Sequence, residues 1–124
     1  MRPLIHPSAE DITVEGILHA LSDPVRVDIF SRIVGARGPQ TCSTFLEACE
    51  RPVPKSTLSQ HFKALRDAGL IRSERKGVEM HNTSRRGEVD KRFPGLLAAI
   101  MAAHRVQTQR AQGAPKRKRQ KAAL

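Results

Sequence analysis

The chain has 124 residues, of which 39% are hydrophobic, enough for one modest core but not for two. Its 22 Lys and Arg residues outnumber its 12 Asp and Glu residues, and the net charge of +10 favours a polyanionic partner such as nucleic acid. The longest apolar run, residues 95–103, is shorter than the about 20 residues of a membrane-spanning helix, and residues 1–7 lack the apolar segment of a secretory signal. We therefore expect a cytoplasmic protein with no membrane partner.

Composition divides the chain into three segments. We expect an N-terminal arm over residues 1–12, one globular domain over residues 13–112 and a disordered basic tail over residues 113–124. The tail has five cations between Lys116 and Lys121 with no acidic residue beside them, and it has little apolar surface to bury. We expect it to bind phosphates without sequence preference rather than to recognise bases.

Apolar periodicity and capping residues predict four helices in the first half of the domain. They span residues 13–21, about 24–34, about 41–49, and from 55 or 56 to 68. The first helix has an apolar stripe of Val14, Ile17, Leu18 and Leu21. Asp11 or Thr13 is the expected cap of the first helix, Ser22 or Asp23 that of the second, and Gly69 the left-handed cap that ends the fourth.

Beyond the fourth helix the pattern predicts a hairpin and a last helix. The strands span residues 70–75 and 78–83, with Arg75, Lys76 and Gly77 at the tip, and the helix spans residues 93 to about 109. Its apolar stripe exceeds the needs of a small core, so we expect a homodimer built through the first and last helices. The predicted fold is mainly α with a small β-hairpin, a dimeric winged helix-turn-helix.

The fourth helix and the hairpin contain the residues expected to contact double-stranded DNA. Hydroxyl and amide side chains near a helix start suit the major groove, and basic side chains suit phosphates. We expect base-edge and nearby phosphate contacts from Ser56, Thr57, Ser59 and Gln60, and backbone contacts from His61 and Lys63. At the hairpin tip, Arg75 and Lys76 are expected to reach phosphates or the minor groove. The alternatives are that Ser56 caps its helix, that His61 is a half-buried hydrogen-bonding residue, and that Arg66 and Arg72 are solvated charges.

Two segments resemble the ArsR/SmtB family of regulators. Residues 19–30, His-Ala-Leu-Ser-Asp-Pro-Val-Arg-Val-Asp-Ile-Phe, look like the family's segment before the helix-turn-helix, and residues 56–71, Ser-Thr-Leu-Ser-Gln-His-Phe-Lys-Ala-Leu-Arg-Asp-Ala-Gly-Leu-Ile, resemble its recognition helix. With the hairpin, the resemblance covers about residues 13–105. It implies a homodimeric repressor that occludes a promoter and dissociates when an inducer binds.

The inducer sites of that family are matched less well. Its arsenic and cadmium sensors have a Cys-x-Cys pair near the third helix, whereas here Cys42 and Cys49 are seven residues apart. Its zinc and nickel sensors use acidic and histidine ligands on the last helix, where this chain has only His104, with His81 in the hairpin. For the two cysteines, a thiol-oxidation switch, a thiophilic metal site and inert packing all remain open.

Other classes of function are less favoured by the sequence. The five histidines have no metal-ligand spacing, and there is no phosphate-binding glycine loop or nucleophile elbow, so we expect no enzymatic activity. A non-specific architectural DNA-binding protein is the main alternative, because net charge and a basic tail give affinity without base recognition. A protein-interaction module is a third hypothesis, which a DNA-binding assay would separate from the first two.

Overall fold

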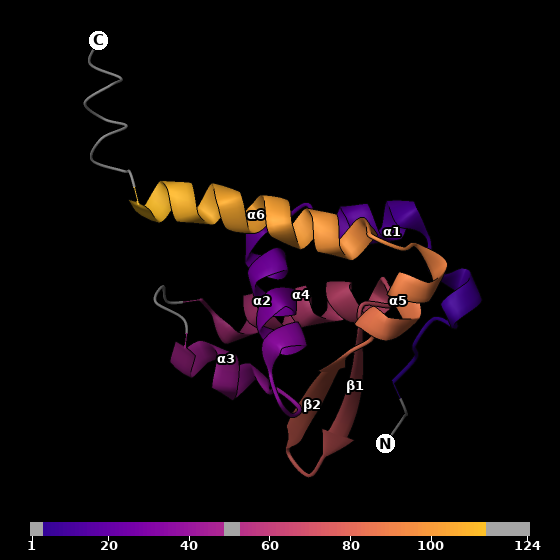
Figure 1. The fold of residues 1–124 in the computed structure, drawn as a ribbon. Helices are drawn as coiled ribbons and strands as arrows, with labels where there is room; N and C mark the ends of the chain where they lie inside the picture. Colours follow the sequence, from indigo (N-terminus) through magenta and orange to yellow (C-terminus); the bar gives the residue numbers. More distant parts are fainter. Residues whose placement is uncertain (1–3, 49–52, 114–124) are drawn as a thin grey trace.

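The computed structural model describes residues 4–48 and 53–113 (Figure 1), which form α-helices and one two-stranded antiparallel sheet. The elements are η1 (Ala9–Asp11), α1 (Val14–Ala20), α2 (Pro24–Gly35), α3 (Cys42–Ala48), α4 (Lys55–Asp67), β1 (Ile71–Lys76), β2 (Glu79–Ser84), α5 (Arg86–Arg92) and α6 (Leu96–Gly113). The predicted class, mainly helical with a small hairpin, is confirmed. Cys49 and the basic tail from residue 114 onward lie outside the described residues, whereas Gly113, expected to begin the tail, is the last residue of α6.

Local capping explains where the first helices begin and end. Thr13 caps α1 by accepting a hydrogen bond from the Gly16 amide at 3.0 Å, and Asp23 caps α2 by accepting one from the Val25 amide at 2.8 Å. Gly69 follows α4 with a φ of +85°, a conformation that glycine adopts without steric cost. The predicted bounds of these three helices are therefore confirmed to within about two residues.

Helix α2 lies at the centre of the hydrophobic core. It packs against α4, α6 and β2, and its buried side chains meet inward residues of each. The largest fully buried apolar side chains are Phe30, Ile17, Ile29, Leu58, Leu65, Leu70, Ile71 and Leu97. Leu18, on the apolar stripe expected for α1, is 49% exposed, because the side of this helix that faces the core is formed by Ile17, Ala20 and Leu21.

The hairpin forms one residue later than the sequence predicts. Ile71 pairs with Ser84 and Lys76 pairs with Glu79, so Gly77, with a φ of +64°, and Val78 form the turn. Arg75 and Lys76 therefore end β1 and do not make the turn itself. The hairpin projects away from α6 as the wing of the fold (Figure 1).

The last part of the chain corrects the prediction in two ways. A short helix, α5, precedes the last one, and apolar periodicity does not predict it because Val89 is its one buried residue. The last helix begins at Leu96 and not at Phe93, since Gly95 has a φ of +86°, outside the helical region. None of the helices within residues 4–48 and 53–113 is both long and apolar enough to cross a membrane.

Residues 4–12 pack along the base of the wing. Ile12 is 2% exposed, the Ser73 amide donates to His6 Nε2 at 3.0 Å, and the Arg85 guanidinium donates to the Pro7 carbonyl at 2.8 Å. Arg85 is buried and also makes two hydrogen bonds to the Glu88 carboxylate, at 3.0 and 2.9 Å. These contacts fix the N-terminal segment and the start of α5 to the wing.

Candidate nucleic-acid interface

Helix α4 has one buried apolar face and one exposed polar face. Leu58, Phe62 and Leu65 are buried, with exposed fractions of 0%, 3% and 0%. The side chains on the opposite face are exposed: Lys55, Ser56, Thr57, Ser59, Gln60 and Lys63. The buried stripe therefore fixes the rotation of the helix and presents its hydroxyl, amide and ammonium groups to solvent.

The start of α4 removes one of the alternatives for Ser56. The residue before the helix is Pro54, with extended backbone and no capping hydrogen bond from its side chain, and Ser56 is the second helical residue. Ser56 is therefore not the N-cap, and the hypothesis that it serves as the cap is wrong. Its hydroxyl lies on the exposed first turn.

His61 and Lys63 are held by neighbouring side chains. His61 is half-buried, and its Nδ1 accepts a hydrogen bond from Arg26 Nε at 3.2 Å, which connects α4 to the start of α2. Lys63 Nζ lies 2.6 Å from an oxygen of Asp67, and both side chains are more than half exposed. Surface pairs of this kind contribute little stability, so Lys63 is free to exchange Asp67 for a phosphate.

Arg75 and Lys76 are exposed near the end of the wing, where acidic residues accompany them. Lys76 pairs in register with Glu79, and a Glu79 oxygen lies 3.6 Å from His81 Nε2. Arg75 pairs with Met80 and has no acidic residue directly opposite. Of these two cations, Lys76 therefore has an acidic residue opposite it in the hairpin and Arg75 does not.

A buried polar cluster joins the wing to α4 and to the segment before α3. Asn82 and Ser73 are 0% and 2% exposed, and the Ser73 hydroxyl donates to Asn82 Oδ1 at 2.6 Å. Asn82 Nδ2 donates to the Gln40 carbonyl at 3.0 Å, while the two backbones exchange hydrogen bonds of 2.9 and 2.8 Å. Arg66 Nη1 donates to the Ser73 hydroxyl at 3.3 Å, so Arg66 is not simply a solvated charge. The cluster holds α4, the wing and the segment before α3 in one arrangement.

Arg72 also has a partner in the structure and is not simply a solvated charge. Its Nη2 lies 3.9 Å from Glu88, which Arg85 holds in place. The hydrogen bond from Arg85 is the main cause that lowers the pKa of the Glu88 carboxyl. Glu88 is therefore an ionised anchor at the base of the wing.

Within residues 4–48 and 53–113, no three His, Cys, Asp or Glu side chains gather as a metal site would require, and Cys49 lies outside these residues. Cys42 is half-buried at the start of α3, and burial raises the pKa of its thiol. A protonated thiol is a poor nucleophile and metal ligand. His104 lies beside Thr108 at 3.3 Å, and His81 beside Glu79. The metal and thiol hypotheses for Cys42 and Cys49 stay predictions.

Two helices joined by a short connection, the second with an exposed polar face and followed by a two-stranded wing, define a winged helix-turn-helix domain. A family model described as a helix-turn-helix domain matches residues 21–74. A Bacillus subtilis protein, the uncharacterized HTH-type transcriptional regulator YceK, is 30% identical over 84 residues, which cover 68% of this chain and 82% of that protein. The chain belongs to the helix-turn-helix transcriptional regulators.

Solved structures agree with this assignment. An ArsR-like transcriptional regulator from Rhodococcus sp. RHA1 is 25% identical with a TM-score of 0.51, over 83% of this chain and 89% of that one. A second ArsR family transcriptional regulator, 21% identical with a TM-score of 0.52 over 89% of this chain and 98% of that one, shares the fold. The expected family resemblance is therefore confirmed.

Proposed function

We propose that this regulator binds promoter DNA sequence-specifically, with α4 in the major groove and the wing on the adjacent backbone. The observation that supports this most strongly is the exposed face of α4, where hydroxyl and amide groups occupy the first two turns while Leu58 and Phe62 hold the opposite face in the core. The proposed activity is binding alone, without catalysis. Because the partner is a promoter, we place this activity in the cytoplasm.

The proposed contacts divide into base recognition and backbone positioning. Ser56, Thr57, Ser59 and Gln60 face the base edges and nearby phosphates, and Lys63, Arg75 and Lys76 bind phosphates. Gln60 is the strongest candidate for base recognition, because its amide can form two hydrogen bonds with adenine in the major groove, one with N6 and one with N7. We propose that His61 lies beside the DNA backbone. Its hydrogen bond from Arg26 fixes α4 against α2.

Two substitutions separate these roles. Fluorescence anisotropy would measure the binding of each variant to a duplex selected for tight binding to the wild-type protein and to a scrambled duplex. Gln60→Ala should weaken binding to the selected duplex by about 1–3 kcal/mol and reduce the preference between the two. Arg75→Ala should weaken binding to both duplexes equally. It should also reduce the slope of log affinity against log salt concentration by about one, because one phosphate contact is lost. Arg105→Ala, which removes an exposed cation from α6, is the matched control. If Gln60→Ala leaves the preference unchanged, the base-recognition role is wrong.

We also propose that the protein is a homodimer built through α1 and α6. Leu18 and Val106 are 49% and 65% exposed, and both helices lie on the side of the fold opposite the wing (Figure 1). The Leu18→Glu/Val106→Glu double variant should sediment as a single chain where the wild type sediments as two. Val78→Glu, at the fully exposed turn of the wing, should leave the oligomeric state unchanged. A wild-type monomer at micromolar concentration would contradict this proposal.

The regulatory effect we propose is repression, with release by an inducer. A dimer lying across a promoter excludes polymerase by occupying the same groove and backbone. In an in vitro transcription assay, the protein should reduce the transcript from a template that contains its selected site. An increased transcript would show activation and would contradict repression.

A further inference from the structure

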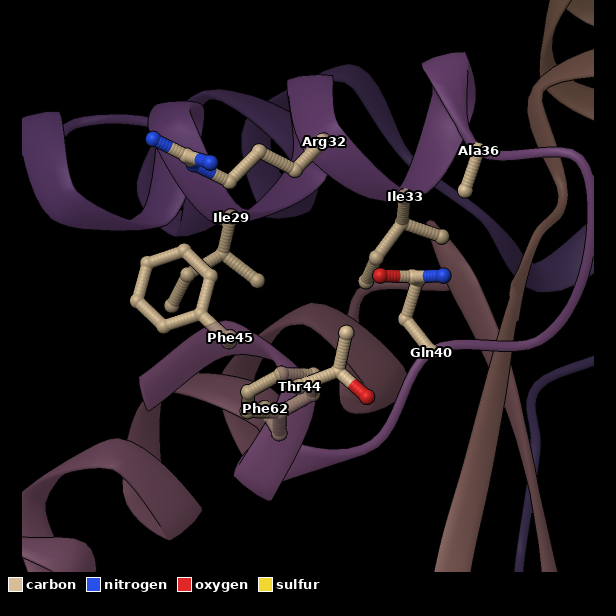
Figure 2. A pocket seen from close by; sticks show the side chains of 8 residues that line it. All are labelled: Ile29, Arg32, Ile33, Ala36, Gln40, Thr44, Phe45 and Phe62. Carbon is tan, nitrogen blue, oxygen red and sulfur yellow. The ribbon is translucent and has the colours of Figure 1, made fainter. Parts of the chain in front are cut away.

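A pocket of about 270 Å³ lies between α2, α3 and α4, on the buried side of α4 (Figure 2). Its apolar walls are the buried side chains Ile29, Ile33, Phe45 and Phe62. At about 30 Å³ per water molecule in the liquid, the volume corresponds to about nine waters and thus to a molecule of about nine non-hydrogen atoms. The pocket therefore suits a small, compact organic molecule.

The charged group at this pocket is Arg32. Its guanidinium lies 5.5 Å above the centre of the Phe45 ring, at the end of the pocket opposite Gln40 (Figure 2). Asp28 accepts a hydrogen bond from Arg32 Nε at 3.3 Å, and within the described residues both Nη atoms are without a partner. A guanidinium with a free edge beside an apolar wall binds a carboxylate in a planar, two-point arrangement.

We propose that this pocket binds a small organic carboxylate with a flat or branched apolar body, and that its binding changes the affinity of the protein for DNA. The apolar body lies between the α2 isoleucines and the two phenylalanines, and the carboxylate meets Arg32. The claim that the pocket binds a carboxylate does not depend on DNA binding. The claim that the carboxylate changes the DNA affinity rests on the proposed DNA-binding function.

The pocket connects directly to every element proposed to contact DNA. Phe62 is on the inner face of α4, two residues after Gln60, and its ring meets the Phe45 ring of α3 edge to face at 6.5 Å. Gln40, at the other end of the pocket, is joined through its backbone to Asn82 of the wing. A ligand that moves α3 and α4 relative to α2 would therefore move the DNA-binding face, and well-packed elements shift between discrete arrangements.

Direct binding of probe molecules to the full chain tests the site without any DNA. Calorimetry with benzoate and cyclohexanecarboxylate should show saturable binding, with the neutral isostere benzamide about tenfold weaker. Arg32→Gln should weaken carboxylate binding about tenfold, and Arg37→Gln, an exposed cation in the following loop, should leave it unchanged. Ala36→Leu, which fills part of the pocket, should abolish binding while the thermal unfolding midpoint is kept.

Two outcomes would overturn the site: neither carboxylate binds with a Kd below about 10 mM, or Arg32→Gln leaves their affinity unchanged. For the regulatory half, a saturating carboxylate should change the DNA affinity by about fivefold or more, and DNA should change the carboxylate affinity by the same factor. An unchanged DNA affinity would overturn that half. A protein that binds carboxylate but no DNA would instead contradict the proposed function and leave the pocket assignment intact.

Discussion

Replacing Asn82 with alanine tests whether the buried polar cluster holds the wing in place. The substitution removes the 2.6 Å hydrogen bond from Ser73 and the Nδ2 donations to the Gln40 and Met80 carbonyls at 3.0 and 3.3 Å. The Gln40 carbonyl keeps the backbone amide of residue 82 as a donor, whereas the Ser73 hydroxyl loses its acceptor and keeps the hydrogen bond that it accepts from Arg66 Nη1 at 3.3 Å.

We expect Asn82→Ala to lower the free energy of unfolding by about 3 kcal/mol. Two good buried hydrogen bonds contribute about 1 kcal/mol each, and the Ser73 hydroxyl left without an acceptor, together with the small void, adds about 1 kcal/mol more. For a domain of this size that corresponds to a fall in melting temperature of roughly 10 °C. Urea and thermal unfolding followed by circular dichroism measure both quantities.

A double-mutant cycle identifies the bond itself. Because Ser73 and Asn82 share one hydrogen bond, the Ser73→Ala/Asn82→Ala double variant should lose about 1 kcal/mol less than the sum of the single variants. Thr83→Ser, at an exposed position on the same strand, should stay within about 0.5 kcal/mol of the wild type. Additive effects, or an Asn82→Ala protein as stable as the wild type, would refute the argument.

Three further substitutions test other packing contacts. Gly69→Ala should cost about 3 kcal/mol in urea denaturation, because φ is +85° there and a Cβ would lie 2.5 Å from the Ile12 side chain. Glu88→Ala should cost about 2 kcal/mol by calorimetry, since buried Arg85 loses both carboxylate bonds but Glu88 itself is 42% exposed. Burial, with nearby arginines, lowers the pKa of His6 from 6.5, so stability should fall as the pH drops from 6.5 through the lower folded-state pKa. His6→Gln should flatten this pH dependence of the melting temperature.

The controls for these substitutions come from the same chain. Gly87→Ala, within α5 and with open space around the added Cβ, should be neutral or stabilising by up to about 1 kcal/mol. Equal losses at Gly69 and Gly87 would contradict the close-approach argument. Glu79→Ala removes an exposed acid from the wing and should cost far less than Glu88→Ala. If the melting temperature of His6→Gln depends on pH in the same way as that of the wild type, His6 does not cause this pH dependence.

The parts of the fold set by neighbouring residues were predictable from the sequence. Asp23 and Gly69 mark the start of α2 and the end of α4 through local hydrogen bonding and backbone conformation. The buried stripe of α4 at helical spacing also predicted which side chains would face outward, and all but half-buried His61 and Arg66 are exposed. Local chemistry therefore gave both the helix-turn-helix and its candidate DNA-binding face.

The features that depend on long-range contacts were not predictable. The sequence allowed His61 to be a half-buried hydrogen-bonding residue, but its partner, Arg26, is 35 positions away. The pairing of Ser73 with Asn82 depends on the register of the hairpin, and the carbonyl that Asn82 reaches belongs to a residue 42 positions away. The pocket depends on the distance at which α2, α3 and α4 pack against one another, which is set by the tertiary fold. Periodicity contains no information about such contacts.

Sequence-specific recognition of promoter DNA is tested most directly by comparing the affinities of the unmodified protein for two DNA duplexes. Fluorescence anisotropy at about 150 mM salt would measure binding to the duplex upstream of its own gene and to a scrambled duplex of equal composition, since phosphate contacts alone are weak there. We expect a preference of roughly a thousandfold for the upstream duplex. Equal binding to that duplex, to the scrambled one and to genomic fragments recovered by affinity selection, with a steep salt dependence, would contradict it in favour of an architectural DNA-binding protein.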